Sequence, residues 1–157
     1  MSAASTNGAS RIVVGVDGSP SSRMALRWAL RQANFTGGTV DAILAWQIPM
    51  VLQSYGMAPV YVEQDGGFEE DAKKTIEAVI SEEVAPADSQ RVRSLVIHGN
   101  PAQVLLDAAV GADLLVVGSR GHGEFAEALL GSVSQNCVHH ASGPVLIMRG
   151  EPGHAAS

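Results

Sequence analysis

The strongest constraint on the fold of this chain is a regular alternation between short apolar runs and longer segments with helical periodicity. The apolar runs are rich in β-branched residues, as at 12–16 and 39–46, and are bounded by glycine or proline. Between them the apolar residues recur at helical spacing, as in Phe68, Ala72 and Ile76. Strands that alternate with helices form a parallel sheet with helices on both faces. The sequence therefore predicts an α/β fold with an open, five-stranded parallel sheet in the order 3-2-1-4-5.

Capping residues and helix breakers place the individual elements. Ser19 and Asn100 are each followed by proline, which is typical of the first residues of a helix. Gly37 and Pro86 are expected to end the first and second helices. The five strands are expected at 12–16, 39–46, 91–97, 114–117 and 144–148, and the last helix at 132–140.

Two loops should meet where the strand order reverses, between the first and fourth strands, and ligands bind at such a point. The first loop carries Asp17, whose carboxylate can accept hydrogen bonds from a ribose or a base amine, or help to hold Mg²⁺. The same residue can simply form a turn with Gly18. The second loop follows Gly118 and leads into a helix at Ser132, where free backbone amides attract anions. Its glycines allow positive φ and close approach of a ligand, but they are also compatible with a flexible connection.

The common nucleotide-binding motifs are absent from both loops. A P-loop requires a lysine after its last glycine, which neither Ser132 nor Val133 supplies, and a dinucleotide fingerprint requires three spaced glycines after the first strand. A PP-loop synthetase would need paired glycines in the stretch VDGSPSS, which has one glycine. The second loop instead reads GSRG, then nine residues, then GS.

This spacing resembles the ATP-binding signature of the universal stress proteins. The stretches IVVGVDGSPSS, HGNPAQVLLDAA, GADLLVVGSRG and GSVSQNCVHHASGPVLIMR resemble other parts of that family, so the likeness covers about 11–149. It implies an adenine-nucleotide hydrolase-like, Rossmann-like fold, and it places the chain in the branch that carries the glycine signature and binds ATP. The family usually forms dimers through its last strand. The apolar strand at 144–148 would lie at a sheet edge, which needs a partner, so we expect a homodimer paired there.

The resemblance also assigns roles to individual residues. The nucleoside side of the site would be formed by Gly15, Val16, Asp17, the backbone of Trp46, Val117 and Gly118. The phosphate side would be formed by Gly121, Gly131, Ser132, Val133 and Ser134. Arg120 lies inside the loop and can either pair with phosphates or stay idle in solvent. Trp46 is bulkier than the aliphatic residue expected at its position.

Length, charge and cysteine content limit the remaining possibilities. With 157 residues, 46% of them hydrophobic, the chain can form one well-packed domain, expected at 11–149 between disordered tails at 1–10 and 150–157. A net charge of −6 argues against nucleic acid as a partner. One cysteine excludes an internal disulfide and suits the cytoplasm. The chain has no apolar run of about 20 residues for a membrane span and no secretory signal at 1–10.

The other reactive side chains do not suggest catalysis or metal binding. The histidines His98, His122, His139 and His140 have no recognisable ligand spacing and are expected to be surface or capping residues. Cys137 falls on the predicted buried face of the last helix and is expected to be a small core residue. No Ser/His/Asp set has a plausible shared site.

The resemblance thus implies an ATP-binding universal stress protein, with or without Mg²⁺, that acts as a regulatory module in stress response. One alternative is a slow ATPase or a nucleotide or phosphoryl transferase, which would need a base that the sequence does not reveal. Another is a dimeric interaction protein with a vestigial nucleotide site. The apolar, proline-containing segment at 47–62 is expected to cover the pocket or a partner surface.

Overall fold

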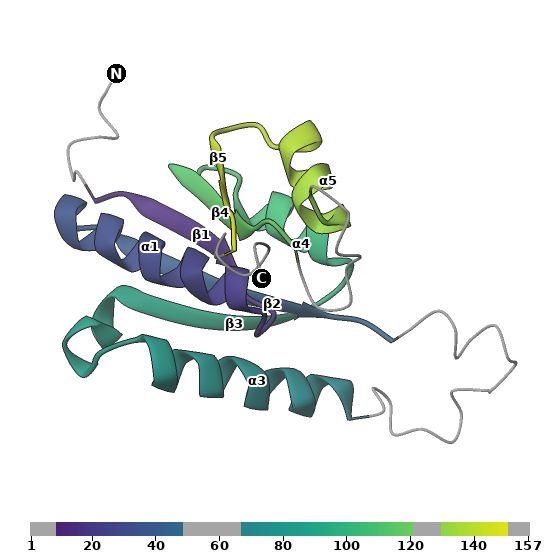
Figure 1. Cartoon of the computed structure of the whole chain (residues 1–157), viewed down its shortest axis with the longest axis horizontal. Coiled ribbons are helices and arrows are strands. Elements are labelled where there is room, and N and C mark those ends of the chain that lie inside the picture. The colour runs from purple at the N-terminus through teal and green to yellow at the C-terminus, as the bar shows by residue number, and fades with distance from the viewer. Residues whose placement is uncertain (1–8, 49–66, 121–129, 151–157) are drawn as a thin grey trace, which may run out of the picture.

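The computed structural model describes residues 9–48, 67–120 and 130–150, which form one twisted parallel sheet between two layers of helices (Figure 1). The strand order is β3-β2-β1-β4-β5, and all four neighbouring pairs run parallel. The predicted fold class and strand order are therefore confirmed. The strands are β1 (Arg11–Gly15), β2 (Thr39–Trp46), β3 (Val92–His98), β4 (Leu114–Gly118) and β5 (Val145–Met148).

The helices begin and end close to the predicted signals. They are α1 (Pro20–Thr36), α3 (Phe68–Glu83), α4 (Pro101–Ala108) and α5 (Ser132–His140). Ser19 and Asn100 cap α1 and α4, each accepting a bond from a backbone amide of the first turn. Gly37 ends α1 in the left-handed conformation, with φ 74°.

One connection differs from the prediction. Pro86 does not end the second helix, which already ends at Glu83; it begins a short 3-10 helix, η3 (Pro86–Arg91). The reason is that proline lacks an amide hydrogen, which suits the first position of a helix as well as the position after its end. The segment at 47–62 lies outside the described residues from 49 onward, so its predicted role as a cover stays a prediction.

The two faces of the sheet bury separate apolar cores. On one face α1 and α3 cover side chains such as Val14 and Ala42, and on the other α4 and α5 cover Val13 and Ile43. The alternation of neighbouring strand residues between the two cores follows from the pleat of a β-strand. Cys137 is fully buried in the second core, as predicted, and burial raises the pKa of its thiol to about 11.

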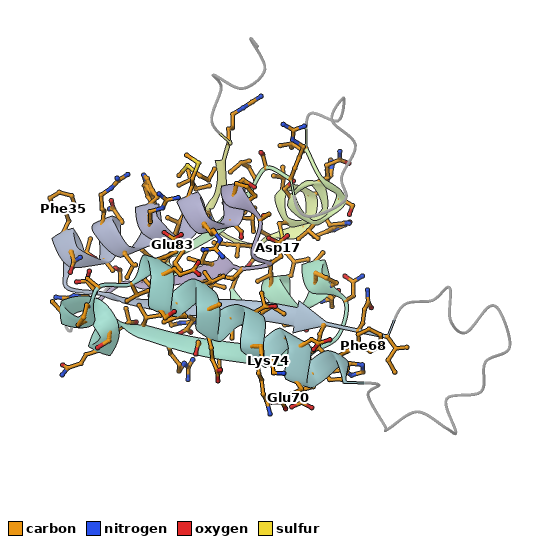
Figure 2. The ribbon with its side chains drawn as sticks, turned by 60° about the horizontal axis from the view of Figure 1, so that its bottom comes forward. Asp17, Phe35, Phe68, Glu70, Lys74 and Glu83 are labelled. Atoms are coloured by element: carbon orange, nitrogen blue, oxygen red, sulfur yellow. The ribbon has the colours of Figure 1, made fainter. Side chains whose placement is uncertain are left out.

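Ion pairs join α1 to α3 across the first layer. Arg23 and Arg27 both reach Glu83, at 3.1 Å each, and Figure 2 shows Glu83 between the two helices. By contrast, Phe35 near the end of α1 projects into solvent and is 86% exposed.

The amino ends of the strands carry a partly buried charge cluster. The Asp41 side chain is 6% exposed and accepts hydrogen bonds from Arg11, at 3.0 Å, and from Arg93, at 2.9 Å. Burial disfavours the charged carboxylate, but these bonds outweigh it and hold the pKa of Asp41 below its ordinary value. Arg11 also donates to the carbonyls of Ala108 and Val110 at the end of α4. The cluster therefore ties three strands and a helix together at one end of the sheet.

Among the described residues, no helix has both the length and the apolar character that a membrane span requires.

Candidate functional site

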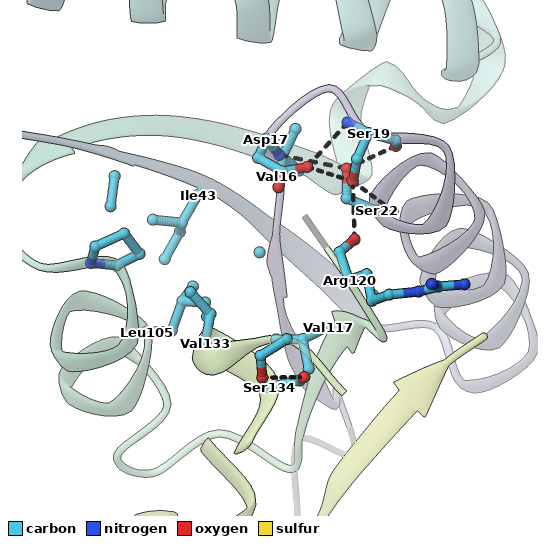
Figure 3. A pocket seen from close by; sticks show the side chains of 15 residues that line it. Val16, Asp17, Ser19, Ser22, Ile43, Leu105, Val117, Arg120, Val133 and Ser134 are labelled. Carbon is cyan, nitrogen blue, oxygen red and sulfur yellow. Dashed lines mark hydrogen bonds between the residues drawn. The ribbon is translucent and has the colours of Figure 1, made fainter. Parts of the chain in front are cut away.

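A pocket of ≈ 230 Å³ lies at the opposite end of the sheet, outside the carboxyl ends of β1, β2 and β4 (Figure 3). One wall is apolar and combines β-strand side chains with Leu105 of α4 and Val133 of α5. The rim is polar. The residues that line the pocket are Gly15, Val16, Asp17, Ser19, Ser22, Ile43, Ala45, Pro101, Leu105, Val117, Gly118, Arg120, Gly131, Val133 and Ser134.

The loop after β1 forms one lip of the pocket. Asp17 is exposed there, and its Oδ1 atom accepts hydrogen bonds from the amide of Ser19, at 2.9 Å, and from the hydroxyl of Ser19, at 2.5 Å. Gly18, between them, has a positive φ of 84°. Asp17 is thus a turn residue, as one hypothesis held, but only one of its oxygens is used. No described residue bonds its Oδ2 atom, which is available to a ligand.

The opposite lip is built from the end of β4 and the beginning of α5. The carbonyl of Ser119 accepts a hydrogen bond from the amide of Gly131, at 2.6 Å. The hydroxyl of Ser134 lies within hydrogen-bond distance of two carbonyls, that of Gly131 at 2.9 Å and that of Ser119 at 3.1 Å. The amide of Ser119 in turn donates to Met148 of β5, at 2.8 Å. These bonds tie residues 119 and 131 together at the base of the second loop. The Gly131 amide is therefore occupied within the protein and does not belong to a free amide array.

Three further amides remain at the beginning of α5. Among the described residues, nothing accepts a hydrogen bond from the amides of Ser132, Val133 or Ser134, and the cap residue Gly131 has no side chain to do so. The first turn of α5 also holds no acidic residue. Unpaired amides at a helix start carry a partial positive charge and bind anions. Val133 and Ser134 line the pocket, so this helix end faces the space a ligand would occupy.

Gly118 and Gly131, the described glycines of this lip, do not play the conformational role predicted for the glycines of the second loop. The φ of Gly131 is −73°, and Gly118 is the last residue of β4 without a positive φ. Gly118 matters for space instead, because a Cβ atom there would lie 2.3 Å from Oγ and 2.8 Å from the carbonyl carbon of Ser21 in α1. Gly15 also lacks room for a Cβ atom, which would lie 2.7 Å from Cδ1 of Leu105 in the pocket wall.

Nine of the twelve predicted site residues line the pocket, and the remaining three are Ser132, Gly121 and Trp46. The nine are Gly15, Val16, Asp17, Val117, Gly118, Arg120, Gly131, Val133 and Ser134. Ser132 is not part of the lining, although its amide begins α5 beside it. Gly121 lies outside the described residues.

Trp46 is the third of these residues. Its side chain packs on the α1 and α3 face of the sheet, against the core on the far side from the pocket, and its ring lies 4.4 Å from that of His98. Its carbonyl accepts the amide of Gly99, at 2.8 Å. The preceding residue, Ala45, lines the pocket in its place.

Sequence reasoning missed six lining residues. Ile43 and Ala45 could have been found, because alternate residues of the second strand share one face. Pro101 and Leu105 lie one helical turn apart on α4, a spacing that marks a common face but not a pocket. Ser19 was predicted only as a capping residue, and Ser22 was given no role. No group of three metal-ligating side chains occurs in the part of the chain that the structure describes.

The chain belongs to the universal stress protein family, whose model matches residues 8–149. It is 34% identical over 143 residues to a universal stress protein of Mycolicibacterium smegmatis, covering 89% of this chain and 48% of the relative. A universal stress protein of Thermus aquaticus is also 34% identical over 143 residues, covering 88% of this chain and 97% of the relative. The chain spans about half the length of the first mycobacterial relatives it matches.

Solved structures show the same fold. The protein MJ0577 superposes with a TM-score of 0.74 at 22% identity, covering 92% of this chain and 98% of its own. A universal stress protein in complex with cAMP superposes with a TM-score of 0.56 at 28% identity, covering 90% of this chain and 98% of its own. An Archaeoglobus fulgidus universal stress protein in complex with dAMP superposes with a TM-score of 0.60 at 21% identity, covering 90% of this chain and 98% of its own.

Proposed function

We propose that this chain binds an adenine nucleotide, with ATP as the first candidate, and acts as a nucleotide-dependent regulatory module in stress response. The observation that carries the proposal is the set of unpaired amides at Ser132, Val133 and Ser134, which begin α5 beside a pocket with an apolar wall. Amides of this kind suit phosphate, and the apolar wall of Ile43 and Leu105 suits a purine base. The relatives in complex with cAMP and dAMP support the same class of ligand.

The charges at the site favour binding over catalysis. Asp17 has one free oxygen for a ribose hydroxyl or for Mg²⁺ held by phosphates, and Arg120 is the cation in the lining. Phosphoryl transfer also requires a positioned base and a clamp of cations or metal. Among the lining residues, Asp17 is the one carboxylate and Arg120 the one cation, which is less than a base with a clamp of several cations, so we propose regulation rather than turnover.

The direct test is to identify the nucleotide that the purified protein retains, by mass spectrometry after heat denaturation. Calorimetric titration should then rank ATP, ADP, AMP, cAMP and adenosine, with GTP as the control for base selectivity. Binding of ATP but no steady-state release of ADP with Mg²⁺ is the expected result. Sustained ADP release would favour the slow ATPase. No binding of any adenine compound would leave the dimeric interaction protein as the better reading.

We also propose that two copies pair along β5. This strand lies at the edge of the sheet, and each of its four residues, Val145–Met148, is half-buried. A short apolar edge strand is a template for pairing with another chain. Sedimentation analysis should therefore show a dimer that Ile147→Lys converts to a monomer. Val138→Lys, which places the same charge at an exposed position of α5, should leave the dimer intact.

The domain limits at 11–149, with disordered tails on either side, stay predictions, as does the cytoplasm as the place of action. The buried thiol of Cys137 is compatible with a reducing compartment.

A further inference from the structure

Ser21 connects the two lips of the pocket although it does not line it. It is the second residue of α1, is 6% exposed, and its hydroxyl donates to the carbonyl of Arg120, at 2.7 Å. Arg120 follows β4 by two residues, so this bond joins the first turn of α1 to the point where the second loop begins. The contact bridges 99 positions of sequence and is part-buried.

The same residue also limits how closely β4 approaches α1. The space that a Cβ atom of Gly118 would need is filled by Oγ, Cβ and the carbonyl carbon of Ser21. Gly118 and Arg120 therefore both contact Ser21, one by close packing and the other by a hydrogen bond. Two contacts on one buried residue fix the direction in which the chain leaves the sheet.

The hydroxyl of Ser19 also approaches the Arg120 carbonyl, but it donates its hydrogen to Asp17. Ser19 Oγ lies 3.4 Å from the Arg120 carbonyl and 2.5 Å from Oδ1 of Asp17 (Figure 3). A hydroxyl has one hydrogen to donate, and the charged, nearer carboxylate receives it. Ser21 is thus the closer of the two hydroxyls that approach this carbonyl among the described residues. Because Ser19 contacts both Asp17 and the Arg120 carbonyl, the position of Asp17 is coupled to the start of the second loop.

We propose that Ser21 is a positioning residue for the phosphate groups of the bound nucleotide. By holding the Arg120 carbonyl, it sets where the second loop starts relative to the amides at the beginning of α5. The apolar wall that would hold the base, with Ile43 and Leu105, belongs to the core on the sheet face opposite α1, the helix that carries Ser21. Loss of the hydroxyl should therefore weaken the phosphate-dependent part of binding and leave the nucleoside part unchanged. This inference rests on the proposed nucleotide binding.

The test compares ATP with adenosine in Ser21→Ala, using calorimetry for ATP and ligand-observed NMR, which detects millimolar binding, for adenosine. Loss of the Ser21 hydrogen bond, which is the shorter of the two hydroxyl contacts to this carbonyl, is expected to weaken ATP binding by roughly fivefold to tenfold. Adenosine affinity should change less than twofold. Ser21→Thr keeps the hydroxyl and should bind ATP within about twofold of the wild type, whereas Ser21→Cys, with its weak donor, should resemble Ser21→Ala.

A matched control removes an equivalent bond far from the pocket. Ser89 donates its hydroxyl to the carbonyl of Pro86, at 2.9 Å, within η3. Ser89→Ala should leave both affinities unchanged. If the wild type binds ATP, two results for Ser21→Ala would overturn the positioning role alone. One is an equal loss of affinity for ATP and adenosine, and the other is no loss of ATP affinity. Absence of nucleotide binding by the wild type would overturn the proposed function and this inference with it.

Discussion

Gly118→Ala is the most direct test of how the two lips of the pocket are held together. The added methyl carbon would lie 2.3 Å from Oγ of Ser21, 2.9 Å from its Cβ and 2.8 Å from its carbonyl carbon. A rotamer change of Ser21 can relieve the first contact only. The other two involve atoms fixed to the backbone of α1, so the helix and β4 must move apart.

The expected cost follows from those distances. Overpacking a closely packed contact costs about 1–3 kcal/mol. Turning Ser21 away also breaks its 2.7 Å bond to the Arg120 carbonyl, which adds about 1 kcal/mol. A total of about 2–4 kcal/mol corresponds to a fall in melting temperature of roughly 5–15 °C for a domain of this size.

Thermal melting followed by circular dichroism measures this fall, and urea unfolding gives the free energy itself. Gly143→Ala is the matched control, because a Cβ atom at Gly143 has nothing within 4 Å. That variant should melt at or slightly above the wild-type temperature, since alanine restricts the unfolded chain. A melting temperature of Gly118→Ala within about 2 °C of the wild type would show that α1 and β4 are not in the close contact described.

Three further outcomes are expected. Gly15→Ala should weaken nucleotide binding with a small change in stability, because the added methyl carbon meets the movable end of Leu105 in the pocket wall; calorimetry beside a thermal melt checks this. Asp41→Asn should lower the free energy of unfolding at pH 7 by about 1–3 kcal/mol, since hydrogen bonds to charged groups are lost. The folded-state pKa of Asp41 is depressed, so its contribution is present above about pH 4 and is lost as the pH falls through the folded pKa. Urea unfolding of both proteins at pH 7 and pH 3 should therefore show the difference shrinking in acid. Cys137, fully buried with a pKa of about 11, should react with a thiol reagent at least roughly a hundredfold more slowly in the native protein than in urea; equal rates would contradict its burial.

Sequence patterns predicted the elements because local chemistry determines them. The dipeptides Ser19-Pro20 and Asn100-Pro101 each specify a helix start. The side-chain oxygen accepts a hydrogen bond from a free amide of the first turn, and the proline suits the first helical position. Gly37 ended α1 for an equally local reason. Pro86 was misread because its local chemistry fits two situations, the end of one helix and the start of another.

The site was predictable only in part, because its details depend on contacts between distant segments. Gly118 and Gly131 of the glycine signature line the pocket, but the role of Gly118 is to make room for Ser21, which lies 97 positions earlier. The amide of Gly131 was expected to face a ligand and instead bonds Ser119. Neither contact can be predicted from the spacing of residues in the sequence, because both form where α1, β4 and α5 meet.

The bond between Ser119 and Gly131 has a consequence for engineering. It joins the two ends of the second loop directly to each other, and the sheet holds both through Met148. An insertion after Arg120, which Ser21 holds, would therefore leave this frame in place. Closing a loop of twice the length costs only about 0.6 kcal/mol more. A sensor peptide or affinity tag inserted there would be attached beside the pocket at ends that the bond between Ser119 and Gly131 holds together.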